Sequence, residues 1–138
     1  MRYLIDTNIF LFYVSNSSCL DNDVCQILEN SENIIYVSSE SIKEAIHLFH
    51  TQRVKTNKWK VSRDIFNFIE KELGFVIKYV QKEHLITFAS LDLVKDRNDP
   101  TDRLIISQAI SEKIPLISSD RKFEHYRKQN LLFIYNRK

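Results

Sequence analysis

Short runs of consecutive apolar residues alternate along this chain with segments in which apolar residues recur every three or four positions. The continuous runs predict buried strands, because strands covered on both faces of a parallel sheet are apolar throughout. Five such runs occur, at Tyr3–Ile5, Ile34–Val37, Phe75–Val80, Pro115–Ser118 and Leu131–Tyr135. The sequence therefore predicts five strands, mostly parallel.

The segments between these runs predict helices. One is expected to start at Asp21 or Asn22, and Gly74 is expected to end another. Strands separated by helices imply crossover connections, and hence the α/β class. No repeat or linker interrupts the pattern, so we expect a single domain over 1–138. The helical patterns cover 22–28, 42–49, 65–73, 85–93 and 104–109, with a short last helix around Phe123 and Tyr126.

Composition narrows the possible functions only slightly. The chain has 20 Lys and Arg against 18 Asp and Glu, so any nucleic-acid role must come from local clustering. One Gly argues against a glycine-rich phosphate loop. Cys19 and Cys25 form no metal-binding or disulfide pattern and fit a reducing compartment. No apolar run approaches the roughly 20 residues of a membrane span, so we expect a soluble cytoplasmic protein.

Four acidic residues stand at corresponding places in the predicted elements. Asp6 ends the first strand, and Asp120 follows the fourth. Glu44 is expected in the first turn of the helix after the second strand, and Asp102 in the first turn of a later helix. Each has a structural explanation, because acids are favoured at helix N-termini. The segment 41–44 has the form of a capping box, and 99–102 has an acid, a proline and a second acid at helix-start positions.

Together the four acids suggest more than capping. Ligands of open parallel sheets bind outside the carboxyl ends of the strands. Carboxylates converging there would raise one another's pKa values unless a cation lay among them. Oxygen ligands of this kind suit Mg²⁺ or Mn²⁺.

The residues around these acids resemble PIN-domain ribonucleases, most closely the VapC-like toxins of bacterial toxin–antitoxin pairs. The resemblance extends over essentially the whole chain. It implies a three-layer α/β/α sandwich with a five-stranded, mostly parallel sheet. Its four blocks are Leu4–Asn8, Ser38–Glu44, Asp99–Ile105 and Leu116–Asp120.

The resemblance also implies an activity, a cofactor and partners. It implies hydrolysis of RNA at a Mg²⁺ or Mn²⁺ site, a homodimer, and a small antitoxin whose C-terminal segment lies in a groove near the site. The apolar positions of 42–50 and 62–74 are candidates for lining that groove, with core packing as the alternative. The site would be built from Asp6, Glu44, Asp102 and Asp120, with Thr7 and Asn8 beside it; Asp99 would assist the site or, as we favour, cap a helix.

One stretch offers candidate RNA contacts. Residues 51–63 carry five basic side chains and no acid. Trp59 lies among them and is a candidate to stack on a base, with a place in the core or a role as an anchor for a protein partner as the alternatives. The basic candidates are Arg53, Lys55, Lys58, Lys60 and Arg63, with Arg97 and Arg103 as weaker ones. A non-catalytic PIN-like module that binds RNA or protein remains the alternative function, and no motif names the RNA.

Overall fold

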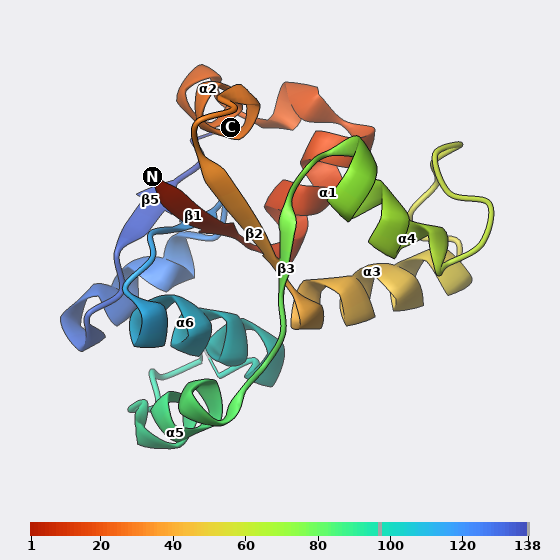
Figure 1. Ribbon diagram of the computed structural model, residues 1–138. Coiled ribbons are helices and arrows are strands. Elements are labelled where there is room, and N and C mark those ends of the chain that lie inside the picture. Colours follow the sequence, from red (N-terminus) through yellow and green to blue (C-terminus); the bar gives the residue numbers. More distant parts are fainter. Residues whose placement is uncertain (97, 138) are drawn as a thin grey trace.

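A five-stranded sheet forms the centre of the protein, whose computed structural model describes residues 1–96 and 98–137 (Figure 1). The strand order is β3-β2-β1-β4-β5, and every pairing among them is parallel. The predicted α/β fold with a five-stranded sheet is confirmed, and each predicted apolar run overlaps one strand. The strands are β1 (Arg2–Ile5), β2 (Ile34–Ser38), β3 (Val76–Lys78), β4 (Leu116–Ser118) and β5 (Phe133–Tyr135).

Helices connect the strands, largely where the apolar periodicity predicts them. The segment predicted as one helix over 65–73 is α4 continued by a π-helical turn, η2, and Gly74 follows at a φ of +67°. The last helix is a 3₁₀ helix, η3. The helices are α1 (Thr7–Ser15), α2 (Asn22–Glu29), α3 (Ser39–His50), α4 (Asp64–Asn67), η2 (Phe68–Glu72), α5 (Lys82–Ser90), α6 (Pro100–Glu112) and η3 (Arg121–Gln129), with a short 3₁₀ turn, η1 (Ser17–Cys19).

One predicted helix is shorter than its pattern. The apolar spacing over 85–93 places Leu93 in the helix, but α5 ends at Ser90 and Leu93 is 69% exposed. Leu91 lies at the C-cap in an extended conformation, with a ψ of 131°. The prediction for Leu93 is therefore wrong, because the chain leaves the helix before reaching it.

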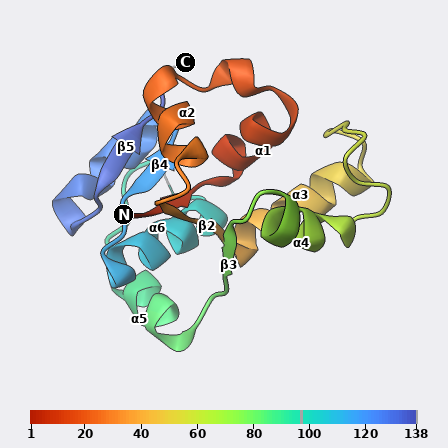
Figure 2. The ribbon, with the colours of Figure 1, turned by 45° about the horizontal axis from the view of Figure 1, so that its top comes forward.

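The sheet is covered on both faces, which gives three layers. Neighbouring residues of a strand point to opposite faces. Ile5 packs into a core shared with α1, α2 and α3, whereas Leu4 packs into a second core with α6 and η3. Figure 2 shows α1 and α2 on one side of the sheet and α5 and α6 on the other. The expected α/β/α sandwich is confirmed.

Trp59 belongs to the first core. Its side chain is only 2% exposed, and its ring stacks on Phe10 at a centroid distance of 6.2 Å. Phe49 and Phe68 meet it edge-on at 5.8 and 6.0 Å. The prediction that Trp59 stacks on an RNA base is wrong, because three aromatic rings already enclose it.

Among the described residues, no helix combines the length and the apolar character that crossing a membrane requires.

Candidate active site

Asp6 is held rigidly where the first strand passes into a helix. β1 ends at Ile5, and Asp6 is the N-cap of α1. One carboxylate oxygen, Oδ1, accepts a hydrogen bond from the amide of Ile9 at 2.9 Å. The other, Oδ2, accepts one from the hydroxyl of Ser118 at 2.5 Å. The side chain is 4% exposed, so capping and a place in a buried site are combined in one residue.

Ser118 connects two of the four acids. It is fully buried at the end of β4, the strand next to β1. Its hydroxyl donates to Asp6 and accepts the amide of Asp120 at 2.9 Å. Sequence analysis did not identify Ser118. The signal available was a polar residue at the last position of an apolar strand, two residues before an expected site acid.

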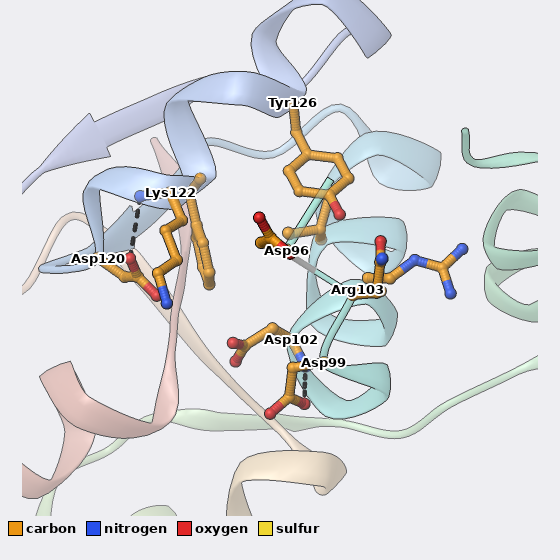
Figure 3. Close-up of a pocket in the computed structure, with 10 residues that line it drawn as sticks. Asp96, Asp99, Asp102, Arg103, Asp120, Lys122 and Tyr126 are labelled. Atoms are coloured by element: carbon orange, nitrogen blue, oxygen red, sulfur yellow. Dashed lines mark hydrogen bonds between the residues drawn. The ribbon is translucent and has the colours of Figure 1, made fainter. Parts of the chain in front are cut away.

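Asp120 and Asp99 both cap helices. Asp120 accepts the amide of Lys122 at 2.9 Å and so begins η3. Asp99 accepts the amides of Thr101 and Asp102 at 2.8 and 3.2 Å, with proline at the first position of α6. The favoured capping interpretation of Asp99 is supported. Asp102 itself caps nothing, and its carboxylate points from α6 toward Asp120 (Figure 3).

Glu44 does not lie where the capping-box interpretation predicts. β2 ends at Ser38, whose hydroxyl accepts the amide of Glu40 at 3.1 Å and caps α3. The helix therefore starts at Ser39, and Glu44 falls in its second turn. The capping box over 41–44 is wrong, because the buried end of the strand supplies an earlier serine. Glu44 does not cap α3. The charge of its carboxylate contributes to the raised pKa values of Asp6 and Asp102.

The two polar residues expected beside the site differ in their surroundings. Thr7 is buried, and its hydroxyl donates to Ser41 Oγ at 2.9 Å. Ser41 lies three residues before Glu44 on α3, so this bond connects the start of α1 to the helix that carries Glu44. Asn8 is exposed.

The four acids act on one another electrostatically. Burial raises the pKa of Asp6 to about 6, and the charges of Asp120 and Glu44 add to the rise. Burial also raises the pKa of Asp102 to about 7, followed by the charges of Asp99, Asp6, Asp120 and Glu44. Such perturbed carboxyls in a cleft are typical of functional sites. Burial and the neighbouring acidic charges at the carboxyl edge of the sheet thus disfavour the ionised forms of Asp6 and Asp102.

A divalent cation fits this donor set by its chemistry. All four side chains offer carboxylate oxygens, and a cation among them would offset the repulsion that, after burial, contributes to the raised pKa values of Asp6 and Asp102. Over residues 1–96 and 98–137, no three Asp, Glu, His or Cys side chains are grouped closely enough to hold one ion. Mg²⁺ usually retains several waters and binds one or two carboxylates directly. The residues present therefore suit an ion held in part through water.

The basic candidates lie apart from this cluster. Arg53, Lys55, Lys58, Lys60 and Arg63 are exposed, around the loop that follows the C-terminal end of α3 (Figure 1). The guanidinium of Arg103 instead packs over the ring of Phe88 at 4.7 Å. Arg97 lies outside the described residues.

Comparison with known proteins agrees with this fold. The model of the PIN domain family matches residues 3–129, and the chain belongs to that family. No curated protein sequence matches the chain.

Solved structures share the fold at low sequence identity. VapBC2 of Rickettsia felis, solved with a promoter DNA fragment, is 19% identical over 99% of each chain, with a TM-score of 0.70. VapBC-1 of nontypeable Haemophilus influenzae is 19% identical over 98% of each chain, with a TM-score of 0.63. VapBC-5 of Mycobacterium tuberculosis, from a toxin–antitoxin family, is 14% identical over 99% of this chain and 98% of that one, with a TM-score of 0.58.

Proposed function

We propose that this PIN domain is a metal-dependent endoribonuclease and the toxin of a toxin–antitoxin pair. The observation that carries the proposal is the set of four carboxylates at the carboxyl edge of the sheet. Burial and the neighbouring acidic charges raise the pKa of Asp6 to about 6 and that of Asp102 to about 7. Ionised carboxylates this close together and partly buried are unfavourable without a counter-ion, so we expect the site to bind a cation.

The proposed roles follow from the surroundings of each acid. Asp6, Asp102 and Asp120 would hold Mg²⁺ or Mn²⁺, some of them through water, and Glu44 would position a second ion or the attacking water. A divalent ion in such a site lowers the pKa of a bound water and offsets charge on a phosphoryl group. Ser118 would hold Asp6 and Asp120 in a fixed position relative to each other, because its single hydroxyl donates to the Asp6 carboxylate and accepts from the Asp120 amide.

RNA would extend from the acids along α3. The five exposed basic residues of 51–63 lie at the far end of the helix whose second turn carries Glu44. At a rise of about 1.5 Å per residue, the seven positions from Glu44 to Thr51 span about 10 Å. Phosphates of a bound strand would contact these residues, with no contribution from Trp59.

An antitoxin would cover an apolar groove along α3, the helix that carries Glu44. A cavity of about 230 Å³ lies over the start of α3 and is lined by Ile42, Ile46, Phe66 and Tyr79, with Ser39 and Lys43. The similar solved structures are themselves toxin–antitoxin complexes. Ile42 is 2% exposed and belongs to the core, so Tyr79, at 55%, offers the larger contact area. The homodimer stays a prediction.

The decisive experiment is cleavage of cellular RNA by purified protein with Mg²⁺, with Mn²⁺ and with chelator. We expect cleavage only with metal, and a loss of at least about 100-fold in D6N, since even outer partners of metal ligands contribute about 10- to 100-fold. The matched control is D21N. Asp21 caps α2 as Asp6 caps α1, but it is not among the charges that raise the pKa of Asp6 or Asp102.

Two outcomes would contradict the proposal. Cleavage of RNA by D6N at the wild-type rate would show that Asp6 is not part of the catalytic site. Failure of folded, antitoxin-free protein to cleave RNA with either metal, combined with RNA binding, would favour the non-catalytic binding module.

A further inference from the structure

A small polar cavity adjoins the acidic cluster between α6 and η3. It measures about 140 Å³, and Asp96, Asp99, Asp102 and Asp120 contribute to its lining. A water molecule occupies about 30 Å³ of liquid, and pockets for whole ligands measure about 300 Å³ or more. The cavity therefore suits a single group, such as a hydrated ion or one phosphate, rather than a complete nucleotide.

Among the described residues, two basic side chains line the cavity, and their surroundings differ. The guanidinium of Arg103 packs on Phe88 at 4.7 Å, and its Nη2 donates to the carbonyl of Leu91 at 3.5 Å, whereas its Nε is buried with no hydrogen-bond partner among the described residues. Lys122 is exposed, and no hydrogen bond or ion pair of its ammonium group occurs within the described part of the chain. Among the described residues that line this cavity, Lys122 is thus the exposed basic residue, whereas Arg103 is held against Phe88.

The backbone of Lys122 is fixed by the acidic site itself. Its amide donates to Asp120 at 2.9 Å, in the first turn of η3. Asp120 is connected in turn to Asp6 through Ser118. Figure 3 shows the Lys122 side chain extending beside Asp120, on the side that Asp102 faces. The hydrogen bond by which Asp120 caps η3 therefore also fixes the backbone from which the Lys122 side chain extends to the cavity.

We propose that Lys122 binds a phosphate group of the RNA at this cavity. The inference rests on the proposed nuclease function and adds to it a residue that contacts the substrate. A phosphodiester approaching four carboxylates meets repulsion, and a neighbouring ammonium offsets part of it through a charge-assisted hydrogen bond to a non-bridging oxygen. Lysine suits this role as a point charge on a flexible stem.

The test compares K122A and K122R with K128A, a matched loss of charge on the same helix. Lys128 is exposed and does not line the cavity. Binding of a single-stranded RNA is measured at several salt concentrations in the D6N background with Mg²⁺, and cleavage is measured with Asp6 intact. Thermal unfolding checks folding, which we expect to be unchanged because Lys122 is exposed.

We expect K122A to weaken RNA binding by roughly tenfold and to reduce the slope of log K against log salt by about 0.7, the contribution of one phosphate contact to a single strand. K122R should retain the salt slope, and K128A should match the parent protein. Equal binding and equal cleavage by K122A and K128A would overturn the role of Lys122 while leaving the nuclease intact. Absence of both RNA binding and RNA cleavage in the parent proteins would overturn the nuclease proposal and this inference together.

Discussion

Asp6 should make the metal-free protein less stable as the pH rises. The pKa of this carboxyl is 3.8 in its ordinary state and about 6 in the folded protein, chiefly because of burial. The folded state thus holds the Asp6 proton more tightly than the unfolded chain does. Its contribution to the free energy of unfolding is greatest below about pH 4 and is lost as the pH rises through about 6.

The size of this effect follows from the two pKa values. Each pH unit of difference corresponds to about 1.4 kcal/mol, so the ionised Asp6 side chain costs about 3 kcal/mol at pH 8. Asparagine has no charge to bury, and its side-chain oxygen can still accept the amide of Ile9 and cap α1. We therefore expect D6N to exceed the wild type in stability at pH 8 and to match it near pH 4.

Urea unfolding in chelator at pH 4.5, 6 and 8 measures the difference. D21N serves as the control for the capping role and should show no such gain with pH. Saturating Mg²⁺ should narrow the gap at pH 8, because an ion that binds only the folded state stabilises the wild type. A constant difference between D6N and wild type across the pH range, or a D6N protein less stable at pH 8, would refute the electrostatic argument.

Two further predictions concern the core and the apolar groove. W59A should lose about 3 to 5 kcal/mol of unfolding free energy, because three aromatic rings enclose Trp59. Urea unfolding measures the loss. A value below about 1 kcal/mol would contradict the place of Trp59 in the core. Y79A should weaken co-purification with the proposed antitoxin and leave folding intact, because Tyr79 is 55% exposed at the groove. L132A removes a 51% exposed side chain outside the groove and should not weaken it. Equal retention of the antitoxin by both variants would exclude the groove as the docking site.

The sequence by itself determined the elements of the sheet and the family. Continuous apolar runs mark each strand because both faces of the sheet are buried, and the acids that follow those runs mark its carboxyl edge. The helix start at Asp99 was predicted, and the cap at Asp21 was one of two adjacent candidates, Asp21 and Asn22. Helix starts were not predictable where several serines compete, so the start of α3 and the turn that holds Glu44 depended on where β2 ends.

Tertiary structure decided which neighbours each side chain has. The polar and basic composition around Trp59 gave no sign of its burial, because its three aromatic contacts come from separate elements, α1, α3 and the π-helical turn, that only the fold brings together around it. Ser118 gained its importance from the pairing of β1 with β4, which brings its hydroxyl to Asp6 across 112 positions of chain. The pKa values of Asp6 and Asp102 likewise depend on burial and on distant charges, which only the folded chain brings together.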